Sequence, residues 1–160
     1  MFKGRFYQRP KKEKKQEDDF LEGVKIKIKK PPIYKAVCRA FGLYKPSACF
    51  TYGDTIYNPE GFNIPEEMIE HEKVHMEQQK VIKPALWWGK FLREPEFRLD
   101  QESKGYARQY DVVCERVKDR NDRNRYLFSY ANSLAGPLYG NCTNTSEAMK
   151  LILSHSKNKR

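Results

Sequence analysis

One stretch of the sequence, NIPEEMIEHEKVHMEQQKVI at residues 63–82, constrains the fold more than any other. It contains a proline near its start, and no further proline or glycine interrupts it before Pro84. Asn63 is followed three residues later by Glu66, which is the spacing of a capping box at a helix N-terminus. The stretch therefore predicts one long helix.

The residues before this helix predict a small sheet. Residues 23–30, GVKIKIKK, alternate apolar residues with lysines, which is the period of a half-buried strand. Lysines on the open face are typical of an edge strand. Residues 48–58, ACFTYGDTIYN, predict a hairpin of two short strands around Gly53-Asp54, whereas residues 34–43 are compatible with a strand or a short helix.

The residues after the long helix predict further helices. Residues 84–95, PALWWGKFLREP, form an aromatic connection with one expected turn of helix, and apolar residues recur at helical spacing over residues 95–117. A helix over residues 125–135 is expected to stop at Gly136-Pro137, and a last helix to follow Asn144. Strands that precede helices indicate an α+β fold with a small N-terminal antiparallel sheet.

The 160 residues are enough for one domain with a hydrophobic core and too few for two domains with a linker. Residues 1–30 carry eleven Lys or Arg and five acidic residues, so we expect a basic N-terminal arm that ends in the edge strand. Residues 31–153 are expected to form the folded domain, and residues 154–160 a basic C-terminal tail.

The net charge of +10, from 31 Lys and Arg against 21 Asp and Glu, predicts attraction to nucleic acid, an anionic membrane surface or an acidic partner. No apolar run reaches the about 18 residues that a membrane span requires, and the basic N-terminus lacks the apolar stretch of a secretory signal. We therefore expect no membrane span and a cytoplasmic location. The four cysteines form no CxxC pair, so buried reduced thiols are expected rather than a disulfide framework.

Residues 71–75, HEKVH, form an HExxH motif inside the predicted long helix. His71 and His75 lie one turn apart on one face of such a helix, so both imidazoles can bind one metal ion at about 2.0–2.1 Å, the zinc distance. Glu72 lies beside them and is the candidate general base, because a carboxylate there can take a proton from a metal-activated water. The alternative is a solvated histidine pair, since lysines and glutamates make this helix polar over much of its surface.

Two histidines leave a zinc site without its usual third protein ligand. A metzincin would have glycine and histidine where this chain has Gln78 and Val81, so that class is excluded. Glu102 lies in the apolar stripe of the helix predicted from Pro95, and a carboxylate at such a position needs a positive partner. A metal ion is one such partner. A salt bridge with Arg98 and an exposed position of Glu102 are the alternatives.

A hydrolytic site also needs a donor for the oxyanion that forms during amide hydrolysis. Tyr106, one turn beyond the candidate third ligand, is the first candidate, and Tyr139 and His155 are the next ones. A core or surface role is the alternative for each of them. Trp87 and Trp88 are expected to pack beside the metal-binding helix rather than to line a substrate cleft.

The segments IEHEKVHMEQQ, FRLDQESKGYARQ, and SLAGPLYGN followed by SEAMKLI resemble the small gluzincin-type zinc metallopeptidase-like domains, in particular short ones encoded by bacteriophages. The resemblance covers residues 36–153. In gluzincins the HExxH helix follows a small sheet, and the third ligand is a glutamate on the next major helix. The resemblance therefore implies a zincin-like fold and a zinc ion bound by His71, His75 and Glu102.

The same resemblance implies a phage-encoded zinc metallopeptidase that hydrolyses a peptide or protein substrate, in which Glu72 and Tyr106 would be the catalytic residues. The basic arm lies outside the resemblance and supports an alternative function. In that alternative the chain is a virion structural or nucleic-acid-associated protein, whose arm binds phosphates or virion proteins and whose metal site is not catalytic. In both cases we expect the protein in the host cytoplasm or in a virion.

Overall fold

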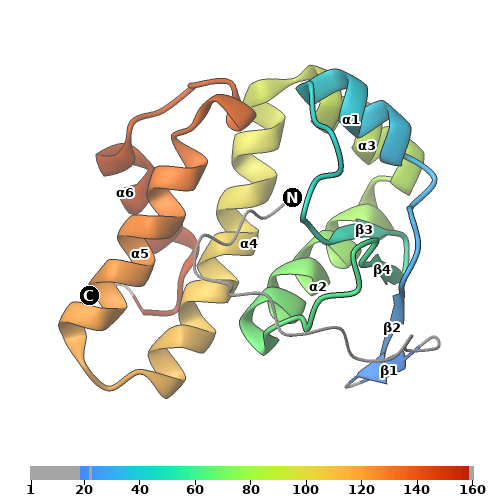
Figure 1. The fold of residues 1–160 in the computed structure, drawn as a ribbon. Coiled ribbons are helices and arrows are strands. Elements are labelled where there is room, and N and C mark those ends of the chain that lie inside the picture. The colour runs from blue at the N-terminus through green and yellow to red at the C-terminus, as the bar shows by residue number, and fades with distance from the viewer. Residues whose placement is uncertain (1–18, 22, 159–160) are drawn as a thin grey trace.

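The computed structural model describes residues 19–21 and 23–158 and shows a small sheet beside a group of helices (Figure 1). The predicted α+β class is confirmed. The strands are β1 (Asp19–Leu21), β2 (Val24–Lys27), β3 (Phe50–Tyr52) and β4 (Thr55–Tyr57). The helices are α1 (Tyr34–Phe41), α2 (Glu66–Val81), α3 (Pro84–Arg93), α4 (Pro95–Arg116), α5 (Arg120–Leu134), the 3-10 helix η1 (Pro137–Tyr139) and α6 (Thr145–His155).

The four strands form one mixed sheet in the order β1-β2-β4-β3. β1 pairs antiparallel with β2, β2 parallel with β4, and β3 antiparallel with β4. β2 therefore lies inside the sheet, so the predictions of an edge strand and of an antiparallel sheet are wrong. Alternation of apolar residues identifies a strand but not its neighbours. Because α1 and β3 lie between β2 and β4 in the chain, β4 can return beside β2 in the same direction.

The folded part of the chain begins earlier and ends later than the sequence predicts. β1 belongs to the segment that was expected to be a basic arm, and residues 1–18 of that arm lie outside the described residues. At the other end, Ser156 Oγ and Asn158 Nδ2 donate hydrogen bonds to Asp111 Oδ1 at 2.5 and 2.9 Å. The described part of the predicted tail, residues 154–158, is thus attached to α4.

The ends of several helices follow local signals in the sequence. α6 begins after Asn144, whose side chain accepts a hydrogen bond from the backbone N–H of Glu147, as predicted. α2 has Pro65 as its N-cap and no side-chain cap, so the predicted capping box at Asn63 is wrong. Pro65 is extended, at φ −61° and ψ 150°, and directly precedes the first helical turn. Asn63 therefore lies two residues before the N-cap, too early to cap the helix.

Two other segments are more helical than expected. Residues 34–43, which were compatible with either structure, form α1, and the helix ends at Gly42 in the left-handed conformation at φ 61°. The aromatic connection is a full helix, α3, with Pro84 at its start. Two of its three buried side chains, Trp87 and Trp88, sit next to each other with their rings 5.1 Å apart.

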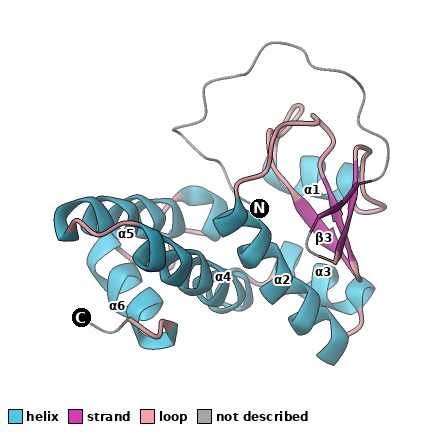
Figure 2. Cartoon of the chain, turned by 90° about the horizontal axis from the view of Figure 1, so that it is seen from below, coloured by secondary structure: helices cyan, strands magenta, loops and turns pink. Residues whose placement is uncertain are grey.

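α2 lies between the sheet and α4 (Figure 2). On the sheet side, Met68 and Ile69 of α2 pack against Ile26 and Ile56. A second apolar cluster joins α1, α3 and the sheet, and a third joins α4, α5, η1 and α6. Since α2 and α4 make the most extensive helix contact, side chains on their facing surfaces are buried between two apolar clusters.

No helix within residues 19–21 and 23–158 has both the length and the apolar character needed to cross a membrane. The four cysteines are free, and the expectation that they are buried is correct for one of them alone. Only Cys49 is fully buried; Cys38 and Cys114 are half-buried, and Cys142 is exposed.

Candidate metal centre

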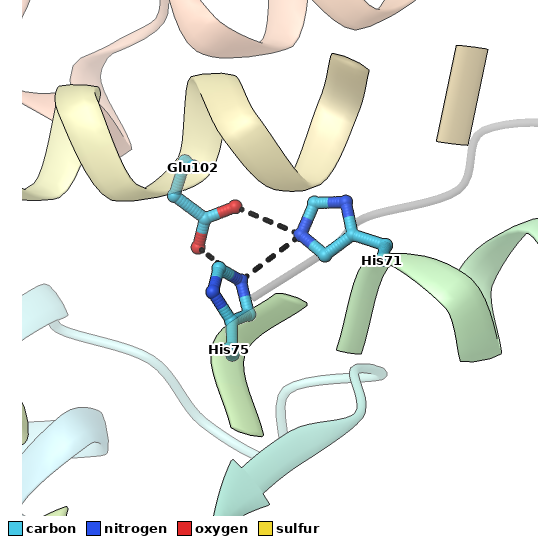
Figure 3. Close-up of side chains that lie close together, drawn as sticks. All are labelled: His71, His75 and Glu102. Atoms are coloured by element: carbon cyan, nitrogen blue, oxygen red, sulfur yellow. Dashed lines mark hydrogen bonds and ion pairs between the residues drawn. The ribbon is translucent and has the colours of Figure 1, made fainter. Parts of the chain in front are cut away.

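Three side chains meet between α2 and α4 (Figure 3). The Nε2 atoms of His71 and His75 lie 3.1 Å apart, because the two residues are one turn apart on α2. Glu102 of α4 points its carboxylate at both rings: Oε2 lies 3.2 Å from His71 Nε2, and Oε1 lies 3.7 Å from His75 Nε2. Two segments 31 residues apart in the sequence thus bring three potential ligand atoms to one point.

All three side chains are removed from solvent: His71 and Glu102 are 0% exposed and His75 is 2% exposed. A solvated histidine pair is therefore excluded. Glu102 does not pair with Arg98, whose guanidinium donates to the backbone carbonyls of Leu138 and Phe91 instead. Of the alternatives for Glu102, both the salt bridge and the exposed position are thus contradicted, and its carboxylate lies within 4 Å of both imidazoles.

The spacing of the donor atoms is compatible with one bound metal ion. Two ligand atoms at about 2.0–2.1 Å from a tetrahedral ion lie about 3.3 Å apart. The two Nε2 atoms are 3.1 Å apart, and the carboxylate of Glu102 reaches His71 through Oε2 at 3.2 Å and His75 through Oε1 at 3.7 Å; one ligand atom from each residue lies within 4.8 Å of the others. Two imidazole nitrogens and one carboxylate oxygen form a ligand set typical of zinc and related transition metals, whereas Mg²⁺ and Ca²⁺ prefer oxygen ligands alone. The residues therefore fit a buried divalent cation.

The other ring nitrogen of each histidine also has a partner. Nδ1 of His71 lies 3.1 Å from Oε1 of Gln109, and Nδ1 of His75 lies 2.8 Å from Oε1 of Gln78. An amide oxygen only accepts hydrogen bonds, so each Nδ1 carries a proton, and the neutral form of each ring then has its lone pair on Nε2, the atom that faces the centre. In both neutral imidazoles the tautomer is thus the one that binds a metal through Nε2.

The charges of His75 and Glu102 stabilise each other. Burial lowers the pKa of His75, but the carboxylate of Glu102 raises it, and the pKa of His75 lies above its ordinary value. Burial raises the pKa of Glu102, yet nearby positive charge, together with the contacts to His75 and His71, holds that pKa well below its ordinary value. Glu102 is therefore ionised throughout the neutral range, which is the form that binds a cation.

Glu72 directly follows His71 on α2 and is 1% exposed. Its Oε2 accepts a hydrogen bond of 2.7 Å from the hydroxyl of Thr51 on β3. Its Oε1 has no hydrogen-bond partner among the described residues, although it is fully buried. A buried carboxylate oxygen without a partner costs free energy, about 1–3 kcal/mol or more, so this oxygen is a candidate to bind a proton or a water during function.

The space next to Glu72 and His75 is narrow. It is lined by Phe50, Thr51 and Trp88 among other side chains. Trp87 lies over His75 with ring centroids 5.3 Å apart, and Trp88 donates from its indole to the backbone carbonyl of Thr51 at 2.9 Å. Both tryptophans are buried beside α2, as expected, and both also line this space.

The candidate oxyanion donors lie in two places. Tyr106 packs its ring edge against His71, with centroids 5.0 Å apart, and its hydroxyl is 3.5 Å from that of Tyr139. Burial raises the pKa of both tyrosines above the ordinary value, so both hydroxyls remain protonated. His155 is exposed near the end of α6, where burial and Lys104 lower its pKa. Tyr106 therefore stays the first candidate among the three.

Gly105 permits the close contact of α4 with His71. A Cβ at this position would lie 2.6 Å from Nε2 of His71, closer than any carbon and nitrogen pack without a bond. One signal of this role is visible in the sequence, because glycine is uncommon inside a helix and this glycine follows Glu102 by three residues. The roles of Thr51, Gln78 and Gln109 had no such signal, since each depends on a partner that only the fold brings close.

Comparison of the chain with protein-family models, with curated proteins and with solved structures found no match to any of them. The function of the chain therefore has to be inferred from the geometry and chemistry of this centre.

Proposed function

We propose that this chain is a zinc-dependent metallopeptidase-like protein of the gluzincin type, which binds zinc through His71, His75 and Glu102 and hydrolyses peptide bonds. One observation supports this function above all. The three ligand candidates converge beside Glu72, which presents a buried carboxylate oxygen without a hydrogen-bond partner among the described residues. A structural metal site needs the ligands alone, whereas amide hydrolysis also needs such a base.

Zinc, when bound, supplies a Lewis acid that polarises a carbonyl group and lowers the pKa of water toward about 7. Glu72 is placed to do the proton transfer. Thr51 holds Oε2 through its hydroxyl, which leaves Oε1 to accept a proton from the attacking water and to return it to the leaving amine nitrogen. Tyr106 has a protonated hydroxyl and serves in this proposal as the donor to the oxyanion.

A peptide needs a path to this centre. Because Glu72 and the three ligand candidates are buried, the side chains that cover them have to move before a substrate can enter. Trp87 and Trp88 are two of these side chains, and both belong to α3. We therefore expect hydrolysis to require a displacement of α3 relative to α2, which would make opening a slow step of the reaction.

The test combines metal content with peptide cleavage. Protein purified without chelator should contain one zinc per chain and cleave members of a peptide library. Glu72→Gln should keep the zinc and lose cleavage, because the base is not a ligand. Glu77→Gln, an exposed position on the same helix, serves as the matched control and should retain both. Zinc-dependent cleavage that survives in Glu72→Gln would reject the proposed role of this residue.

The complete burial of the ligands favours a second function, in which the metal stabilises the fold and no reaction occurs. The chain would then be a virion structural or nucleic-acid-associated protein with a zincin-like domain. In that case the protein should bind zinc, cleave no peptide, and unfold at a clearly lower temperature after chelation. Deletion of residues 1–18 should then remove a salt-dependent affinity for DNA.

A further inference from the structure

His75 is held by a closed ring of contacts that joins three helices. Its Nδ1 lies 2.8 Å from Oε1 of Gln78, and Nε2 of Gln78 donates to the backbone carbonyl of Gln101 at 3.1 Å. The side chain of Gln101 in turn accepts a hydrogen bond of 2.9 Å from the indole of Trp87. The ring of Trp87 lies over His75, so the chain of contacts returns to the residue where it began.

The direction of each hydrogen bond in this ring is fixed by chemistry. A backbone carbonyl only accepts, so the amide nitrogen of Gln78 has to face Gln101 and its oxygen has to face His75. An amide oxygen also only accepts, so Nδ1 of His75 has to be the donor. Gln78 thereby selects the tautomer of His75 whose Nε2 lone pair faces His71 and Glu102.

Gln78 also connects the two helices that carry the ligands. It belongs to α2, three residues after His75, and its second hydrogen bond reaches α4 at the residue directly before Glu102. A single side chain thus sets the orientation of the second ligand and the distance of that ligand from the third. Gln109 gives His71 the same kind of amide acceptor, but it is 2% exposed, whereas Gln78 is half-buried.

We propose that Gln78 is a positioning residue of the metal centre, which holds His75 in its metal-binding tautomer and ties it to the α4 backbone beside Glu102. This inference rests on the metal binding in the proposed function and not on peptide hydrolysis. An acceptor behind a histidine ligand commonly changes metal affinity 10–100-fold.

The experiment measures zinc affinity by competition with a chromophoric chelator for the full chain, Gln78→Ala and Gln78→Glu, with Glu77→Ala as the exposed control on the same helix. Gln78→Ala should bind zinc about 10–100-fold more weakly. Gln78→Glu keeps an acceptor toward Nδ1 but loses the donor to the carbonyl of Gln101, so it should bind zinc more weakly than the natural chain and more tightly than Gln78→Ala. The control should bind unchanged. Since Gln78 is half-buried, its replacement is compatible with folding, which circular dichroism verifies.

A second readout separates positioning from general stability. The Co²⁺-loaded natural chain and the Gln78→Glu variant should share one visible absorption spectrum, and Gln78→Ala should show an altered one, because the ring of His75 is no longer held. Equal zinc affinity in the natural chain and in Gln78→Ala would overturn this inference alone, and so would a Gln78→Glu variant as weak as Gln78→Ala. A natural chain that binds no zinc would overturn the proposed function as well.

Discussion

Gly105 of α4 lies directly under the imidazole of His71, so close that a Cβ at position 105 would stand 2.6 Å from Nε2 of that ring. Two helices can place a carboxylate and two imidazoles within bonding distance of one ion only if their backbones approach closely. The glycine allows that approach at the point where α4 passes the first ligand. Several of the outcomes below depend on this close packing of α2 and α4.

Gly105→Ala should weaken zinc binding at least about tenfold, because a clash in a well-packed interior typically costs 1–3 kcal/mol and here displaces a ligand atom. Chelator competition measures the affinity. Gly89→Ala is the matched control: it is also a helical glycine, but a Cβ there would meet only the flexible end of Arg93, at 3.3 Å. The control should bind zinc like the natural chain, and equal affinities in both variants would argue against tight packing at His71.

Thr51→Val should destabilise the protein by about 1–3 kcal/mol, since it leaves the buried Oε2 of Glu72 without its donor. Zinc content should not change, because neither residue is a ligand. Peptide cleavage should fall, as the carboxylate is no longer held in one orientation. Thr51→Ser keeps the hydroxyl and should behave like the natural chain in urea unfolding and in cleavage. If valine and serine gave the same unfolding curve, the hydrogen bond would have no measurable role.

The stabilisation of the fold by zinc should depend on pH. The raised pKa of His75 gives the metal-free protein a contribution to stability that is complete below pH 6.5 and is lost as pH rises through the raised value. The lowered pKa of Glu102 gives a contribution that is present above pH 4.5 and is lost as pH falls through the lowered value. Without metal, this pair therefore stabilises the fold most between pH 4.5 and pH 6.5.

Zinc has to displace the proton of His75, so its effect should be larger where that proton is already absent. We expect the increase in melting temperature on adding zinc to be greater at about pH 8 than at about pH 6 by at least ~3 °C, which corresponds to a tenfold difference in apparent affinity. Differential scanning fluorimetry with and without zinc at the two pH values measures it. A larger increase at the lower pH would contradict the assigned direction.

Asp111→Ala should lower the free energy of unfolding by about 1–3 kcal/mol without changing zinc affinity. Its buried carboxylate accepts hydrogen bonds from Ser156 and Asn158, which attach the chain end to α4. Urea unfolding measures the loss. Glu115→Ala, an exposed position on the same helix, is the control and should unfold like the natural chain. A fall in zinc affinity in Asp111→Ala would show that the chain end also supports the metal centre.

The metal-ligand candidates were the part of the structure most open to prediction. His71 and His75 follow from the motif and from the helical period, and both depend only on local structure. Glu102 required one further step, because a carboxylate in an apolar stripe needs a positive partner. The structure confirms that the three side chains converge, and it contradicts the competing pairing with Arg98.

Other features could not be derived from local patterns. The apolar alternation in β2 predicts a strand, but it carries no information on whether β4 lies beside it in parallel. β1 was hidden inside a charged segment whose composition favours an arm. Gln78 and Thr51 have ordinary polar positions in the sequence, and their partners His75 and Glu72 become apparent only when the packing of α2 against α4 and β3 is known.

The most direct test of the metal centre is anomalous X-ray scattering at the zinc absorption edge, from crystals of the full chain purified without chelator. We predict one anomalous peak between α2 and α4, at about 2.0–2.1 Å from Nε2 of His71, from Nε2 of His75 and from the carboxylate of Glu102. A well-ordered structure with no peak at this position, or with zinc bound only elsewhere, would contradict the assignment of these three residues as metal ligands.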